Sequence, residues 1–127
     1  MIPSARTAYM EASVQTASPA RLLVMLYERL VLDCRRALTA QQAGDHLEAH
    51  TQLMHAQDIV IELRSSLKVD DWEGGPALAS LYDYVLTRLV SANVQRDAAT
   101  TEHCLELVTG LAEAWREAAL QATAVGA

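Results

Sequence analysis

Apolar side chains recur every three or four positions in four stretches of this chain, which is the spacing of a helix that buries one face. The stretches cover about residues 19–42, 46–67, 76–95 and 98–121. The periodic positions of the last three predict these inward seams: Leu53, Ala56, Val60, Leu63 and Leu67; Leu78, Leu81, Val85, Leu89 and Ala92; Cys104, Val108, Leu111, Trp115 and Ala118. The pattern therefore predicts four amphipathic helices.

Residues with strong turn and capping preferences separate these helices. Ser18 is a good N-cap, and Pro19 suits the first helical position, where its missing N–H costs nothing. Gly44 can end the first helix in a left-handed conformation. The polar stretch 68–75, KVDDWEGG, reads as a loop, and Pro76 reopens a helix. Because short connections make neighbouring helices antiparallel, we predict an all-α, up-down antiparallel four-helix bundle.

Length and composition agree with one small helical domain. The 127 residues suffice for a single core, and 51% of them are hydrophobic but only 5% aromatic, with no Phe. Ala, Leu and Val thus supply most of the apolar content, which favours packed helices over sheets. We expect one domain over residues 1–127, with an N-terminal segment 1–17 that is mobile or partly helical.

The charge and the lack of a long apolar run exclude several classes of partner. The net charge is -6 and the basic residues are scattered, whereas nucleic-acid or anionic-membrane binding needs a clustered basic face. The run Leu22 to Tyr27 is far shorter than the roughly 20 residues that span a bilayer. Cys34 and Cys104 lack CxxC or Cys/His spacing and are predicted to be small buried hydrophobes. We expect a cytoplasmic protein without membrane insertion.

The chain contains none of the common sequence motifs for catalysis or cofactor binding. The chain has no Gly-rich phosphate loop and no GxSxG sequence. His46 and His50 are four residues apart, with His55 further along, but no Glu-x-x-His pattern accompanies them. We predict no enzymatic activity, no cofactor and no metal site.

Several apolar positions remain outside the seams. They are Leu22, Val24, Met25, Tyr27, Val31, Leu32, Ile59, Ile61, Tyr82, Tyr84 and Leu86. Individually they can widen the core stripe, but as a set they favour an exposed apolar groove that takes an amphipathic helix from a partner. Asn93, near the end of the third helix, either caps its own helix or meets the backbone of an added chain.

Five short blocks occur in a characteristic order: TASP (16–19), LLVMLY (22–27), QDIVIEL (57–63), LYDY (81–84) and AN (92–93). This ordered set resembles the flagellin-specific export chaperone family, the FliS proteins. The resemblance implies a cytoplasmic chaperone that holds the C-terminal segment of flagellin in an apolar groove, prevents its premature polymerisation and keeps it competent for type III flagellar secretion. It also suggests the export apparatus and a competing regulator as further partners.

The resemblance and the predicted groove together indicate a set of flagellin-binding residues. They are Tyr9, Val14, Thr16, Leu22, Met25, Gln57, Ile61, Tyr82, Leu86 and Asn93. The chain departs from the family pattern at Arg29, where glycine is usual, at His55, where a basic residue usually opens the block, and at Ser80, where asparagine often precedes the LY pair.

A different class of function remains open on the residues alone. A four-helix adaptor or regulatory protein could use the same apolar patch to form a homodimer. The two alternatives differ in stoichiometry, because a symmetric dimer buries its patch without a client. A chaperone is expected to be a monomer or a weak dimer when free and to bind one client segment per protomer.

Overall fold

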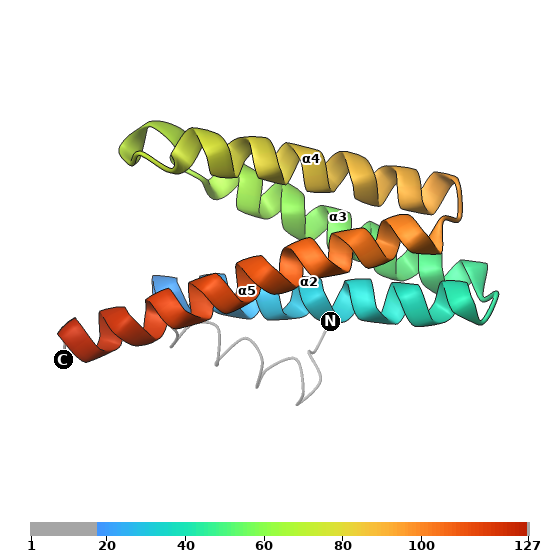
Figure 1. Cartoon of the computed structure of the whole chain (residues 1–127), viewed down its shortest axis with the longest axis horizontal. Coiled ribbons are helices and arrows are strands. Elements are labelled where there is room, and N and C mark those ends of the chain that lie inside the picture. The colour runs from blue at the N-terminus through green and yellow to red at the C-terminus, as the bar shows by residue number, and fades with distance from the viewer. Residues whose placement is uncertain (1–17, 127) are drawn as a thin grey trace, which may run out of the picture.

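The computed structural model describes residues 18–126, and these fold into four α-helices. They are α2 (Pro19–Gln42), α3 (His46–Ser66), α4 (Gly75–Val94) and α5 (Ala98–Gly126), with a short 3-10 helix η1 (Val69–Asp71) before α4. Successive helices run in opposite directions (Figure 1). The predicted all-α antiparallel bundle is confirmed, whereas the prediction for residues 1–17 lies outside the described part of the chain.

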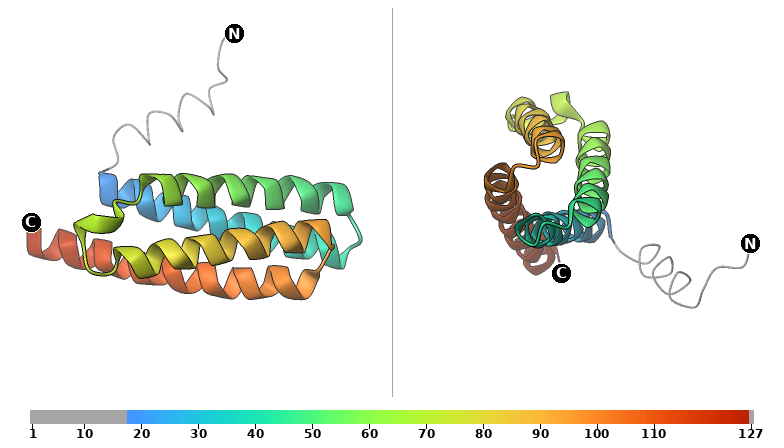
Figure 2. Two further views of the ribbon diagram at one scale, coloured as in Figure 1. Left: turned by 90° about the horizontal axis from the view of Figure 1, so that it is seen from above. Right: turned by 90° about the vertical axis from the view of Figure 1, so that its right-hand side faces the viewer.

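The helices form a closed ring in which each packs against two neighbours. α2 contacts α3 and α5, and α4 also contacts α3 and α5, so that α2 and α4 lie diagonally opposite (Figure 2). Each helix therefore buries a wide part of its surface, which contacts two neighbouring helices and the shared core.

Local hydrogen bonds set the helix ends. The Ser18 hydroxyl accepts a hydrogen bond from the Arg21 N–H at 3.2 Å, and Pro19 occupies the first turn of α2. Gly44 has φ of 72° in the α2–α3 turn, a left-handed conformation that glycine adopts without a Cβ penalty. The Asp45 carboxylate then accepts from the Glu48 N–H at 3.1 Å and caps α3.

The core contains most of the predicted seams, with one exception. Ala118 is exposed, close to the C-terminal end of α5, where Ala119 and Leu120 rather than Ala118 lie beside the start of α2. The last turns of α5 project past the start of α2 (Figure 1). Five apolar residues assigned to the remainder outside the seams are in fact buried: Val24, Tyr27, Val31, Ile59 and Tyr82. These five therefore widen the buried stripe, which the sequence left open for single residues, since a helix with two neighbours buries more than one seam.

Candidate functional site

Exposed apolar side chains line the outer side of α3 and α4. Leu47 (78% exposed), Met54 and Ile61 (49% exposed) follow one another at seven-residue spacing along α3, so they form a row on one side of the helix. On α4, Val90 and Val94 (77% exposed) are likewise exposed. We call the surface formed by these five residues the α3–α4 face.

Two polar contacts between the helices tie the two sides of this face together. The Arg64 Nε donates to Asp83 Oδ1 at 3.1 Å, and the Asn93 Nδ2 donates to His50 Nδ1 at 2.9 Å. Asn93 therefore joins α4 to α3, where the sequence suggested a helix cap or a contact with an added chain. The two contacts hold α3 and α4 in a fixed relation along the face.

Gln57 and Leu86 lie between these two contacts. Gln57 is seven residues from both His50 and Arg64, and Leu86 is seven residues before Asn93, so helical spacing places them on the sides where α3 and α4 meet. Gln57 is buried and Leu86 is half-buried against the core. Four of the predicted binding residues, Gln57, Ile61, Leu86 and Asn93, thus come together at or directly beneath the α3–α4 face.

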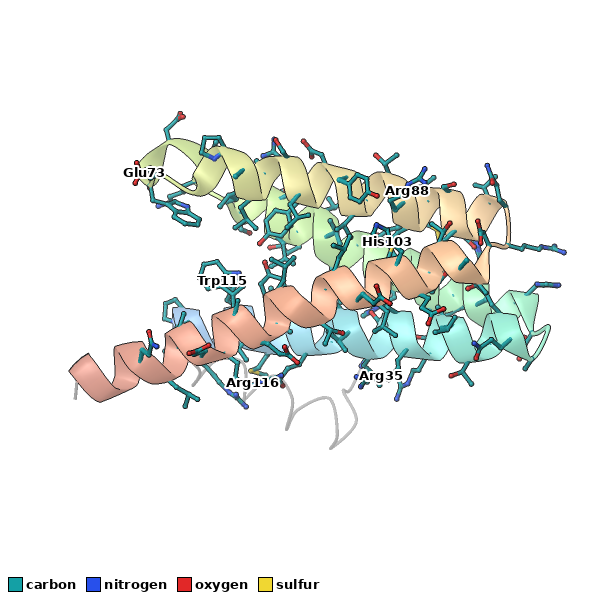
Figure 3. The ribbon with its side chains drawn as sticks, in the orientation of Figure 1. Arg35, Glu73, Arg88, His103, Trp115 and Arg116 are labelled. Carbon is teal, nitrogen blue, oxygen red and sulfur yellow. The ribbon has the colours of Figure 1, made fainter. Side chains whose placement is uncertain are left out.

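A second apolar feature is a cleft of about 340 Å³ at the end of the bundle where α2 and α4 begin. Its walls include Leu22, Leu26, Tyr82, Trp72 and Trp115, and we call it the end cleft. Trp72 meets Trp115 edge to face with their ring centroids 6.5 Å apart. Figure 3 shows Trp115 extending from α5 toward the α3–α4 side of the bundle. Apolar walls with few polar groups suit the burial of a partner's apolar side chain.

Tyr82, in the wall of the end cleft, contacts a second buried tyrosine, Tyr27. The hydroxyls of Tyr27 and Tyr82 are hydrogen-bonded to each other, and the Tyr27 ring stacks on Trp115 at a centroid distance of 6.4 Å. Burial raises the pKa of both phenols above the usual range, so both stay protonated. Tyr82 is thus a core residue whose side chain also lines the cleft.

Of the remaining predicted binding residues the structure describes only Met25, which is part of neither surface. Met25 is half-buried on α2 and, by helical spacing, lies on the side of α2 that faces away from the core. Tyr9, Val14 and Thr16 lie outside the described residues. The sequence reasoning missed Met54, which seven-residue spacing from Ile61 indicates. It also missed Trp72, which only the fold brings to the cleft.

The described part of the chain offers no cation site or membrane span. No group of three or more His, Cys, Asp or Glu side chains in it is arranged to hold a metal ion. His50 and His55 are instead engaged with Asn93 and Asp33. None of the described helices combines the length and the apolarity needed to span a bilayer.

Comparison with known families assigns the chain. The family model of the flagellar protein FliS matches residues 1–122. The chain belongs to the FliS family. The motif-based resemblance is therefore confirmed, and with it the coarse role of flagellar export chaperone.

Individual relatives and a solved structure agree with this assignment. The flagellar secretion chaperone FliS of Bacillus subtilis (strain 168) is 34% identical over 112 residues, which cover 88% of this chain and 84% of the relative. The FliS of Salmonella typhimurium is 33% identical over 111 residues, covering 84% and 81%. A solved bacterial flagellar chaperone superposes with a TM-score of 0.74 over 92% of this chain and 96% of its own, at 20% identity, and so shares the fold.

Proposed function

We propose that this FliS protein is a cytoplasmic chaperone that binds the C-terminal segment of flagellin along the α3–α4 face and in the end cleft. The observation that carries the proposal is the row of exposed Leu47, Met54 and Ile61 on α3 beside Val90 and Val94 on α4. Apolar patches of this kind on soluble proteins mark sites of interaction. Family membership supplies the class of client.

The shape of the surface suits an amphipathic helix. Seven-residue spacing on α3 offers a straight apolar ridge, and a client helix laid beside it would cover the exposed side chains at α3 and α4 together. Burial of a large aliphatic side chain contributes about 1.5–3 kcal/mol, which offsets the several kcal/mol needed to order a disordered segment. The client helix would then be covered and unable to polymerise.

Residues 1–17 are proposed to cover apolar surface in the free protein and to shift when the client binds. Ser18 follows this segment and the next residue, Pro19, lines the end cleft, so the segment is joined to the bundle at the rim of a candidate binding surface. Tyr9, Val14 and Thr16 are then the residues expected to contact the client. Amide exchange tests this: protection in residues 1–17 should change on adding flagellin peptide, and equally slow exchange with and without it would refute the gating role.

The main test is calorimetric titration with the C-terminal peptide of flagellin. We expect one-to-one binding with a large negative heat-capacity change, as for coupled folding on an apolar surface. Light scattering of the free protein should show a monomer or weak dimer. A stable dimer that binds no peptide would instead support the homodimerising adaptor.

Point variants distinguish the binding surface from the core. Ile61→Asp should weaken peptide binding by about tenfold or more and leave helix content intact, because the side chain is 49% exposed and an acid there opposes burial. Leu86→Asp should weaken binding and also lower stability, because Leu86 packs against the core. Leu63→Asp should unfold the bundle, since Leu63 is buried.

Leu120→Asp is the matched control, because Leu120 is an exposed leucine on α5 that belongs neither to the α3–α4 face nor to the lining of the end cleft. It should bind peptide like the wild type. If Ile61→Asp and Leu120→Asp bind equally well, the α3–α4 face is not the client site. If Ile61→Asp unfolds, Ile61 belongs to the core.

A further inference from the structure

α2 differs in charge from the other described helices. It carries four arginines against two acids, Glu28 and Asp33, and is the only one of these helices with more basic than acidic side chains. The chain as a whole has a net charge of -6. A positive helix on an acidic protein creates a local field that attracts negative partners.

Two arginines of α2 flank a line on its outer side that consists of two apolar residues and a threonine. Met25, Leu32 and Thr39 follow at seven-residue spacing, and Arg35 and Arg36 flank Leu32 on its two sides by helical geometry. We call these five residues the α2 face. Figure 3 shows Arg35 pointing away from the bundle, on the side of α2 opposite α4. This arrangement, an apolar seam with flanking charges, is the one that pairs two helices in a coiled coil.

The surface is hollowed on both sides of this line. A depression of about 500 Å³ lies between α2 and the start of α3, with Leu32, Arg35, Arg36 and Thr39 in its lining. A second depression of about 250 Å³ lies between α2 and α5, and Arg35 lines it together with Arg116. Arg35 thus stands on the ridge between two hollows.

Four acids, Asp45, Glu48, Glu28 and Glu113, line the two hollows, and none of them forms an ion pair with Arg35 or Arg36. Asp45 caps α3, Glu48 accepts from Gln52 at 2.8 Å, and Glu28 lies 3.6 Å from Arg116. Within the described residues, Arg35 and Arg36 are exposed and form no ion pair. Their charges are therefore available to a partner.

We propose that the α2 face docks an acidic amphipathic helix of a second protein. Apolar side chains of that helix would lie on Met25 and Leu32, and its carboxylates would pair with Arg35 and Arg36. The surface is separate from the α3–α4 face, because α2 and α4 are diagonal in the ring, and none of its five residues lines the end cleft. The protein can therefore hold its flagellin client and this second partner at once, which goes beyond the proposed function.

An anionic membrane is the less favoured occupant. The overall net charge of -6 opposes approach to an anionic bilayer, and the apolar strip of Met25 and Leu32 is too narrow to insert. A helix with two rows of carboxylates matches the two flanking arginines, Arg35 and Arg36.

The test uses the full-length protein and a synthetic three-heptad helical peptide with leucine at the seam positions and glutamate at the flanking positions. Fluorescence anisotropy should show binding that weakens as salt is raised, because exposed charge pairs are screened. Arg35→Glu and Arg36→Glu should each weaken it by about fivefold. Arg96→Glu, an equal charge change in the α4–α5 turn, should leave the affinity unchanged.

A charge swap makes the result specific. The same peptide with lysine in place of glutamate should bind the Arg35→Glu/Arg36→Glu variant better than it binds the wild type. Saturating flagellin peptide should leave the acidic peptide's affinity unchanged. The proposal is overturned if the variants bind the acidic peptide as the wild type does, if flagellin peptide competes with it, or if anionic vesicles co-sediment with the protein while the peptide does not bind.

Discussion

Asp33 is a fully buried carboxylate that joins two positions where the chain departs from the usual family pattern. Arg29 donates its Nε–H to Asp33 Oδ1 at 2.9 Å, and His55 on α3 hydrogen-bonds to Oδ2. A buried charge destabilises the folded state unless it is paired. The contacts of Arg29 and His55 together offset the cost of burying the Asp33 carboxylate. Arg29 is thereby engaged within the bundle, although the sequence alone left it free to face a partner.

This grouping predicts strong coupling between Arg29 and His55. Arg29→Ala or His55→Ala alone should lower the free energy of unfolding by about 1 kcal/mol, because Asp33 keeps one partner. The double variant should lose about 3–5 kcal/mol, more than the sum, because the buried carboxylate is then unpaired. Urea denaturation measures both. Asp33→Leu added to the double variant should restore stability, and simple additivity would contradict the grouping.

At the scale of the elements, the space around the glycines differs. The two glycines of the α3–α4 connection are closely packed, whereas the glycine inside α5 has open space around it. A Cβ on Gly75 would lie 2.0 Å from the carbonyl oxygen of Val69, and one on Gly74 would lie 2.2 Å from the Trp72 ring. This close packing holds Trp72 at the end cleft. Gly110 is inside α5, and a Cβ there would meet nothing within 4 Å.

Alanine substitutions should therefore have opposite effects at the two sites. Gly75→Ala should lower stability by about 2 kcal/mol or more, because backbone must move to admit the methyl group. Gly110→Ala should raise it by about 1 kcal/mol, because alanine is the better helix former. Thermal unfolding followed by circular dichroism compares them, and a stable Gly75→Ala protein would mean that the connection is looser than described.

At the scale of the whole molecule, the packing of α2 against α5 encloses both cysteines. Burial raises the pKa of the Cys34 thiol to about 12 and that of Cys104 to about 11, from a usual value of 9.0. The folded protein thus keeps both thiols protonated at a pH where the unfolded chain ionises them. Each thiol contributes stability below pH 9, and this contribution is lost as the pH rises toward 11 to 12.

The free energy of unfolding should accordingly fall by about 1 kcal/mol per thiol between pH 8 and pH 10. Tyr27 and Tyr82 act in the same direction at higher pH, because burial raises the pKa of each phenol. Urea denaturation at both pH values measures the change. In the double variant Cys34→Ala/Cys104→Ala the free energy of unfolding should change less between pH 8 and pH 10 than it does in the wild type. This comparison does not depend on how stable the variant is at either pH. An equal change in both proteins would contradict the assigned burial of the thiols.

Much of the architecture follows from local chemistry that the sequence contains. Helix formation depends on residues within one or two turns, so the apolar periodicity and the residues Ser18, Pro19 and Gly44 predicted four helices and their antiparallel order. The same periodicity correctly predicted that Ile61, which is exposed, lies outside the buried seam of its helix. The ordered motifs identified the family because they are read directly along the chain.

Contacts between residues far apart in the sequence could be identified only from the tertiary structure. The pairing of Tyr27 with Tyr82 joins residues 55 positions apart, and the His55–Asp33 contact joins two different helices. Periodicity shows which side of a helix is apolar but not which neighbour covers it or how wide the covered arc is. The burial of Tyr82 and the place of Trp72 in the end cleft were therefore decided only when four helices closed into a ring, because each then gained two neighbours.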